Sequence, residues 1–437
     1  MFSGPKIMKF LMVIMMMVMM KTTKNSIFNY SLIVLLLNLN LQKQDMSKMS
    51  YFLWGDELSF WTFDLSVWVI FILIFSKINQ PKIYNKCMFI MLMLLMVTFY
   101  SWNMMMFYLM FEISMIVVLT VIMTWGYQPE RVEAILFMII MTVLTSLPFI
   151  ITIMNNKNNL NFWNIQFMSI NMWEYLSLMF VFMMKMPTMF LHMWLPKVHV
   201  ESPVQGSMIL AAVLLKMGSY GLIRATATNL HLNMKLSWLI MSFSMWSMFI
   251  MTMICLMQTD LKTMIAYSSV VHMTLVFAAI TLNKTKSMMG SIYIMIGHGM
   301  CSAGLFYLTN IAYVNSKSRS IIINKGSFSM FPTAVPIWFF LCMGNSPMPP
   351  SINIMGEFFS FKSILNWSST TTIIMLMMMI MFSSSLYSIF MFYIATHGIF
   401  KKSMIKIKNF NSKNKNTSML HIIPMLSISA NPDMLVI

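Results

Sequence analysis

The sequence predicts an all-α polytopic membrane protein with about 14 transmembrane helices. Hydrophobic residues make up 59% of the 437 residues and charged residues only 9%, whereas soluble domains contain about 25% charged residues. Apolar runs of about 20 residues, the length at which a helix crosses a bilayer, recur along nearly the whole chain. Transmembrane β-strands would appear instead as alternating segments of about 10 residues.

The apolar runs are separated by short connectors that carry lysine, asparagine, glycine or proline, so each run is interpreted as one helix. The longest polar connectors, around 40–57 and 400–417, are too short to fold as separate domains. One membrane domain over residues 1–437 is therefore expected. The candidate helices, in order, are 7–20, 27–41, 58–76, 87–100, 102–124, 133–153, 175–195, 202–224, 235–257, 261–282, 288–313, 331–365, 371–394 and 416–430.

Two of these candidates contain prolines that interrupt a helix. Pro187 lies two residues after Lys185, where it removes a backbone donor and frees a carbonyl. The candidate 331–365 is too long for one span and holds three prolines within 347–350. Irregular backbone at membrane depth is tolerated only where it lines protein or a water cavity. We therefore interpret the seventh and twelfth candidates as discontinuous helices.

Interrupted helices in comparable positions of two halves are typical of inverted repeats. Here the repeats would be helices four to eight and nine to thirteen. Within the single domain, residues 1–100 would hold the N-terminal helices and 416–430 the C-terminal helix. The first repeat would have its core at 102–224, together with helix 87–100, and the second repeat would occupy 235–394.

Loop charge predicts the orientation of the helices. With fourteen helices, the loops after odd-numbered helices hold 17 of the 29 Lys and Arg residues. Loops on the inner side of a membrane carry an excess of Lys and Arg, so these odd loops are expected inside. Counting the twelfth helix as two spans would give a smaller excess of the opposite sign. The odd loops include Lys77, Lys82, Lys86, Lys401 and Lys402.

Four charged residues lie within or beside long apolar runs. Lys185 and Lys216 are near the middle of two consecutive runs, and Glu112 and Glu357 are the two acidic residues most clearly inside others. A charge at the centre of a span costs about 3 kcal/mol and marks an ion path. Burial disfavours the charged form whereas an opposite charge favours it, so such pairs can exchange protons near neutral pH. Static ion pairs that select helix partners are the alternative, although buried pairs are poor stabilisers.

Three histidines extend this set. His272 and His298 lie in the middle of apolar runs, and an imidazole with an ordinary pKa near 6.5 suits a proton relay. Each taken singly would more often be a core residue, but the partnership with Lys185, Lys216 and Glu357 favours a relay. His192 falls seven residues after Lys185, about 10 Å along the same helix face, so it is a candidate for a path toward the membrane surface.

Other kinds of site lack support in the sequence. The net charge of +17 is scattered through short loops, so a nucleic-acid partner is not expected. No GxGxxG or GxxxxGK[ST] motif indicates a nucleotide. The cysteines are far apart and form no CxxC pair, so neither an iron–sulfur cluster nor a zinc site is indicated. They are Cys87, Cys255, Cys301 and Cys342.

The stretch LPKVHVESPVQGSMILAAVLLKMGSYGLIR, 195–224, closely resembles the signature of the proton-translocating antiporter-like subunits of respiratory complex I. The segments WGYQPERVEA, VFMMKMP, QTDLKTMIAYSSVVHM and NSPMPPSINIMGEF, in this order, narrow the resemblance to mitochondrial members of that family. The 60 methionines, with many Asn and Lys, also resemble a product of an AT-rich animal mitochondrial genome, where a codon normally read as Ile is read as Met.

The resemblance implies a subunit that moves protons and carries no redox centre. NADH, FMN, iron–sulfur clusters and ubiquinone would be bound by other subunits of NADH:ubiquinone oxidoreductase. The partners would be other membrane-arm subunits and the lipid of the mitochondrial inner membrane, with the odd loops toward the matrix. The family's residues for proton translocation fall on Glu112, Lys185, Lys216, His272, His298 and Glu357.

Three further interpretations remain open. A stand-alone cation/proton antiporter with the same fold would exchange ions without a redox partner. A scaffold that only fills the membrane arm would need Glu112, Lys185 and Glu357 for assembly alone. Quinone binding by this chain is also open, although nothing in the sequence marks a site for the headgroup.

Overall fold

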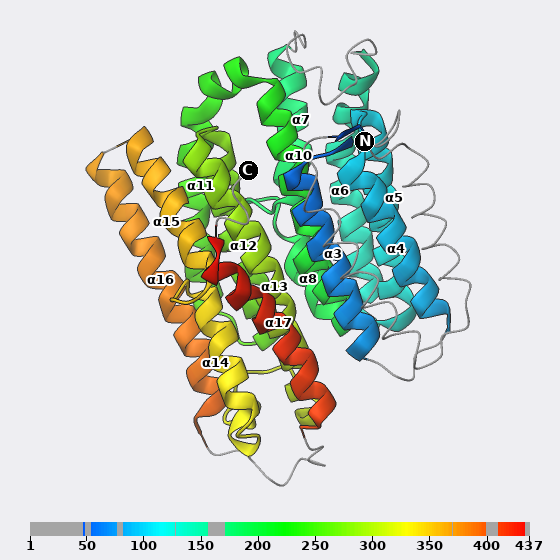
Figure 1. Ribbon diagram of the computed structural model, residues 1–437, viewed down its shortest axis with the longest axis vertical. Helices are drawn as coiled ribbons and strands as arrows, with labels where there is room; N and C mark the ends of the chain where they lie inside the picture. The colour runs from blue at the N-terminus through cyan, green and yellow to red at the C-terminus, as the bar shows by residue number, and fades with distance from the viewer. Residues whose placement is uncertain are drawn as a thin grey trace.

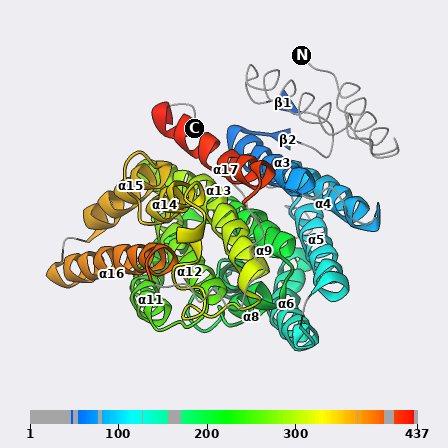
Figure 2. The same ribbon diagram turned by 90° about the horizontal axis from the view of Figure 1, so that it is seen from below.

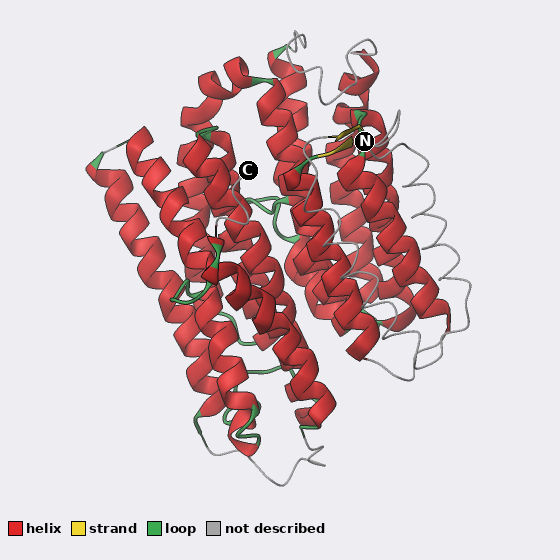
Figure 3. Cartoon of the chain, viewed as in Figure 1, coloured by secondary structure: helices red, strands yellow, loops and turns green. Residues whose placement is uncertain are grey.

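The computed structural model describes residues 47–48, 54–76, 82–126, 128–155, 171–368, 370–398 and 410–432. The predicted helices 7–20 and 27–41 lie outside the described residues. The described part is a bundle of long helices (Figures 1 and 3), and it also includes two short antiparallel strands, β1 (Ser47–Lys48) and β2 (Trp54–Gly55).

The predicted all-α polytopic class is confirmed. Among the described residues, 9 helices are long and apolar enough to cross a membrane. Their ends lie within a few residues of the predicted bounds. Eight of the nine are single continuous helices: α3 (Glu57–Ser76), α4 (Lys82–Tyr100), α5 (Met104–Trp125), α6 (Arg131–Asn155), α11 (Leu230–Leu256), α12 (Leu261–Thr281), α13 (Thr285–Ser316) and α16 (Thr371–Thr396). The ninth is the span Val204–Thr228, described below, and α17 (Ser412–Ala430) is a further continuous helix that is not one of the nine.

The seventh span is discontinuous, as predicted, but its bounds differ from the prediction. It consists of α7 (Met172–Lys185) and α8 (Trp194–Glu201), so the span continues past the predicted end at 195. Pro196 lies in the first turn of α8, where a missing backbone N–H breaks no hydrogen bond. The proline therefore starts a helix here and does not end one.

The twelfth span is also discontinuous, because α14 (Ala334–Asn345) and α15 (Ile352–Trp367) are separated by the proline cluster. The eighth span is distorted in a way that the sequence did not indicate. A π-helical turn, η3 (Leu210–Leu214), lies between α9 (Val204–Ile209) and α10 (Leu215–Thr228).

The helices form two sets of five, and the fourth member of each set is the interrupted one. The first set is α4, α5, α6, α7 with α8, and α9 to α10; the second is α11, α12, α13, α14 with α15, and α16. Because each set has five spans, the second set begins at the opposite end of the bundle from the first, which makes the repeats inverted. Seen along the helices, α15 and α16 lie at one edge and α4 and α5 at the opposite edge (Figure 2).

The odd-numbered loops meet at one end of the bundle. Arg319, after α13, donates through Nη1 to Gln128 Oε1 at 3.3 Å, between α5 and α6. Lys262, at the start of α12, donates to the carbonyl of Ser202, after α8, at 3.2 Å. We call this end the odd-loop end.

Burial separates central helices from peripheral ones. Within an 18-residue apolar segment of each helix, 100% of the residues are buried in α13 and 89% in α12. The corresponding shares are only 33% in α16 and 39% in α6. The peripheral helices therefore present broad apolar faces outward, as expected for contact with lipid or with other membrane subunits. Two of the ionisable residues described next, His272 and His298, lie on the central helices α12 and α13.

Candidate functional site

Glu112 on α5 and Lys185 on α7 form an ion pair near one edge of the bundle. The Nζ to Oε1 distance is 3.7 Å, longer than a hydrogen bond, and the Lys185 side chain is only 1% exposed. The same amine lies 4.3 Å from the centre of the Phe111 ring. Lys185 is the last residue of α7, where the carbonyl ends of a helix favour a positive charge. The pair is in contact but loosely held.

Lys216 on α10 is held by the π-helical turn. The N–H of Leu215 donates to the carbonyl of Leu210, five residues back, so the carbonyl of Ala211 loses the partner it would have in an α-helix. Lys216 Nζ donates to that carbonyl at 2.5 Å. The side chain is 2% exposed. The distortion thus provides a neutral acceptor for a buried amine in the middle of the membrane domain.

Lys216 continues into a row of ionisable side chains from three other helices. Its Nζ lies 3.0 Å from Nδ1 of His298 on α13. The rings of His298 and His272 on α12 are 5.4 Å apart. His272 Nδ1 then lies 3.2 Å from Oε1 of Glu357 on α15, and its Nε2 lies 3.4 Å from the hydroxyl of Tyr387 on α16. All members of this row are buried.

The structure therefore places the six predicted residues in two groups, and the members of each group lie close to one another. Glu112 and Lys185 form the first, and Lys216, His298, His272 and Glu357 form the second. Tight packing brings the groups together, because a Cβ added at Gly218 would lie 2.9 Å from Cβ of Lys185. Lys185 Nζ has no hydrogen-bond partner in the described part of the chain, so a proton crossing between the groups needs a further movement or a bridging water.

The prediction for His192 was wrong in its geometry. It assumed one helix from Lys185 onward, but α7 ends at Lys185 and His192 lies in the break before α8. The helical spacing does not apply there, because the chain leaves the helix axis before Pro187. His192 is buried, with its ring 6.1 Å from that of Tyr267.

Sequence reasoning missed a second group of buried polar residues near the odd-loop end. His199 on α8 is fully buried and stacks on Phe306 at 4.7 Å, and it interacts electrostatically with both Lys216 and Lys262. Glu201, the last residue of α8, lies 3.7 Å from Arg319. The predicted helices 175–195 and 202–224 leave the polar run 197–201 in a connector, whereas the structure has it in α8. A helical reading of LPKVHVE with Pro196 in its first turn would have found them.

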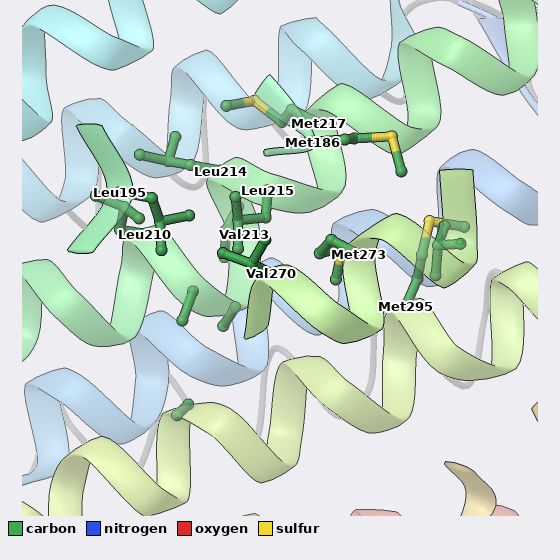
Figure 4. Close-up of a cluster of buried hydrophobic side chains, with 14 of the residues drawn as sticks. Met186, Leu195, Leu210, Val213, Leu214, Leu215, Met217, Val270, Met273 and Met295 are labelled. Carbon is green, nitrogen blue, oxygen red and sulfur yellow. The ribbon is translucent and has the colours of Figure 1, made fainter. Parts of the chain in front are cut away.

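Apolar side chains enclose the lysines and histidines. Met186, Leu215, Met217 and Met273 adjoin the ionisable residues in sequence, and all are fully buried in one cluster (Figure 4). Electrostatic interactions are stronger where water is excluded. A change in one charge of the row therefore acts strongly on its neighbours. Within the residues that the structure describes, no group of three or more His, Cys, Asp or Glu could hold a metal ion.

Replacing Arg319 by glutamine is expected to destabilise the odd-loop end. The side chains of Arg319 and Glu201 are 9% and 6% exposed, and removing one partner of a buried pair costs about 3–5 kcal/mol. Lys262 interacts with the same carboxylate and offsets part of this cost. The thermal unfolding temperature of the purified assembly should fall in Arg319→Gln and partly recover in Arg319→Gln/Glu201→Gln. Equal unfolding temperatures for the single variant and the wild type would contradict the pairing.

The fold and the buried row define a class: transporter-like membrane proteins built from inverted five-helix repeats, with ionisable groups beside interrupted helices. The family profile described as "NADH:quinone oxidoreductase/Mrp antiporter, TM" matches residues 101–383. A chain of respiratory complex I from Thermus thermophilus, solved with bound NADH, has the same fold, with a TM-score of 0.83 and 19% identity over 93% of this chain and 90% of that one.

Animal proteins narrow the assignment. NADH-ubiquinone oxidoreductase chain 4 from Ceratitis capitata is 36% identical over 411 residues, which cover 92% of this chain and 91% of that protein. The protein of the same name from Scyliorhinus canicula is 32% identical over 433 residues, 94% of each chain. The chain belongs to this antiporter-like family and, within it, to the NADH-ubiquinone oxidoreductase chain 4 proteins. The resemblance carried by the four sequence segments is thereby confirmed.

Proposed function

We propose that this chain is a proton-translocating membrane-arm subunit of NADH:ubiquinone oxidoreductase in the mitochondrial inner membrane. The observation that carries the proposal is the buried row from Lys216 through His298 and His272 to Glu357, with the Glu112–Lys185 pair packed beside it. Charged residues inside a membrane domain are costly and mark ion paths. Names of relatives and the family description support the same assignment.

The Glu112–Lys185 pair is the gate in this proposal. While the pair is closed, the carboxylate stabilises the charged amine. When a neighbouring subunit draws Glu112 away, the buried ammonium loses its counter-charge, and an unpaired buried charge is costly. Lys185 then releases its proton toward Lys216. The long 3.7 Å contact and the partial exposure of Glu112, 25% for its side chain, suit a pair that opens and closes.

The row carries the proton onward. Lys216 passes a proton to Nδ1 of His298, and the two histidines pass it to Glu357. Each group accepts one proton and releases one, so the row returns to its starting state after a transfer. The electron-transfer chemistry, with NADH, FMN, iron–sulfur clusters and ubiquinone, belongs to other subunits. Those subunits supply the driving event, through their charge or their conformation.

Protons enter from the odd-loop end, which faces the matrix in this proposal because its loops hold most of the basic residues. Glu201, Lys262 and the fully buried His199 lie between that end and Lys216. These three side chains give a polar path for protons from the odd-loop end to Lys216, between apolar side chains.

Purification from native membranes tests complex membership directly. The chain is expected to migrate with NADH-oxidising subunits, and vesicles holding the intact assembly should acidify or alkalinise only when NADH is oxidised. The chain reconstituted alone should exchange no cation for protons, because the driving event is missing. Cation/proton exchange by the isolated chain, without any redox partner, would favour a stand-alone antiporter and overturn the proposal.

A further inference from the structure

The break between α14 and α15 is lined by polar side chains that the row does not use. Asn345, Ser351 and Asn353 are 1%, 3% and 1% exposed. Both polar atoms of the Asn345 side chain, Oγ of Ser351 and Oδ1 of Asn353 have no hydrogen-bond partner among the described residues. Buried polar atoms without protein partners usually bind water. The break is therefore a polar, water-accepting site inside the bundle.

This site adjoins the proton row. Asn353 and Glu357 are four residues apart on α15, so they lie on one face of the helix. The Oδ1 atom of Asn353 also lies against the backbone at Gly297, the residue before His298. His298 uses Nδ1 for Lys216, and its Nε2 has no partner in the described ranges. The break thus lies beside Glu357 and beside the backbone that directly precedes His298.

On its other side the break lies against the C-terminal helix α17. A Cβ added at Gly344, the residue before Asn345, would lie 3.1 Å from Sδ of Met425 on α17. Met425 and His421 are four residues apart and share one face of that helix, about 6 Å along its axis. His421 is fully buried, and neither of its ring nitrogens has a partner within the described residues.

His421 leads toward the odd-loop end. Its ring lies 6.5 Å from the ring of Tyr307 on α13. The Tyr307 hydroxyl accepts from Thr417 Oγ1 at 2.6 Å and donates to Asn414 Oδ1 at 3.2 Å. Asn414 is only partly buried, and the next residue, Lys415, is exposed. Polar groups therefore run from the surface at the start of α17 to His421 and on to the break.

We propose that His421 exchanges protons on a second branch of the path, which joins the odd-loop end to Glu357 and His298 through the break between α14 and α15. The imidazole takes a proton at one ring nitrogen and gives one from the other, so it returns to its neutral form. Water held by Asn345, Ser351 and Asn353 carries the proton across the break. The branch rests on the proposed function of the chain, because it delivers protons to the same row.

The alternative is that His421 only fills space between helices. An unpaired buried polar group costs about 1–3 kcal/mol, and the contact that His421 makes with α13 at Gly304 is through its apolar Cβ atom, 3.2 Å from a Cβ added at that glycine. A leucine of similar size would fill the space without that cost. Packing alone therefore gives no reason for a histidine here, whereas proton exchange does.

His421→Gln in the full complex tests the branch, because glutamine keeps the polarity and approximate size but cannot carry a proton. Positioned proton carriers contribute about 10²–10⁴-fold. We expect the ratio of protons moved to NADH oxidised to fall, while NADH oxidation with an uncoupler stays unchanged. Ser418→Ala, on the same helix, is the matched control, since its hydroxyl donates only to backbone carbonyls of its own turn.

Tyr307→Phe is the second variant, because it removes a single oxygen from the branch and keeps the packing. The same fall in the ratio is expected. If assembled His421→Gln and Tyr307→Phe complexes both move protons at the wild-type ratio, the second branch is overturned. Lys185→Ala is measured in parallel to distinguish the branch from the proposed function. A wild-type ratio of protons to NADH in Lys185→Ala overturns the proposed function itself. A lost ratio in Lys185→Ala, together with wild-type ratios in His421→Gln and Tyr307→Phe, overturns the branch alone.

Discussion

Replacing Lys185 by alanine is expected to abolish proton movement through this subunit while the complex still assembles. The amine is the cation of the Glu112 pair and lies at the end of α7, beside the row that begins at Lys216. Without it the gate has no proton to release, and a loss of about 100-fold or more in transfer through the gate follows. The Glu112 side chain is 25% exposed, so its carboxylate is not fully buried when the amine is removed. The loss in free energy of unfolding is therefore expected to be modest.

The Lys185 prediction is measured as protons moved per NADH oxidised in sealed vesicles, together with the amount of assembled complex. Lys197→Ala is the matched control, because Lys197 is a lysine in the same span whose side chain is 50% exposed and contacts the exposed Glu133 and the ring of Phe137. Removing such a surface pair costs about 0–1 kcal/mol. A fully assembled Lys185→Ala complex that pumps like Lys197→Ala would show that the assigned role of Lys185 is wrong.

Replacing Lys216 by methionine is expected to stop transfer in the row and to lower stability as well. Methionine keeps the length and apolar volume of the side chain, but it cannot donate to Ala211 or contact His298 as an amine does. The carbonyl freed by the π-helical turn then stays buried and unpaired, which costs about 1–3 kcal/mol. The complex should unfold at a lower temperature and lose proton movement.

Ser219→Ala is the control for Lys216, because its hydroxyl, one turn away, donates only to the carbonyl of Lys216. This variant should keep both the unfolding temperature and the pumping ratio close to wild type. If Lys216→Met lowered stability but left the ratio of protons to NADH intact, Lys216 would be a structural residue that fills the π-helical turn. The row would then need another group between Lys185 and His298.

The sequence predicted the fold well because long apolar runs and proline breakers act locally. The bounds of α12 differ from the predicted 261–282 by a single residue, and both discontinuous spans were located from Pro187 and from the prolines within 347–350. The continuation of the seventh span to Glu201 was not predicted. The predicted span ends at 195, directly before Pro196, whereas the structure has this proline in the first turn of α8.

The six ionisable residues were found from their cost in a membrane, but their contacts were not. Nothing in one sequence shows that His298 contacts Lys216, whereas His272 contacts Glu357. These contacts depend on how α10, α12, α13 and α15 pack, which is set by tertiary structure. The π-helical turn was equally hidden, because LAAVL has no local feature that differs from an ordinary helix. His421 was not among the predicted residues, because its burial against Tyr307 and Gly304 of α13 depends on a contact between segments far apart in sequence.

The most direct test of the central claim is the ratio of protons moved to NADH oxidised, measured in the same vesicle preparation for wild type, Lys185→Ala, Lys216→Met and Lys197→Ala. If the buried row carries the proton, the ratio falls in both variants of the row and stays at the wild-type value in the surface variant, with NADH oxidation under uncoupled conditions preserved. Wild-type ratios in assembled Lys185→Ala and Lys216→Met complexes would contradict the account.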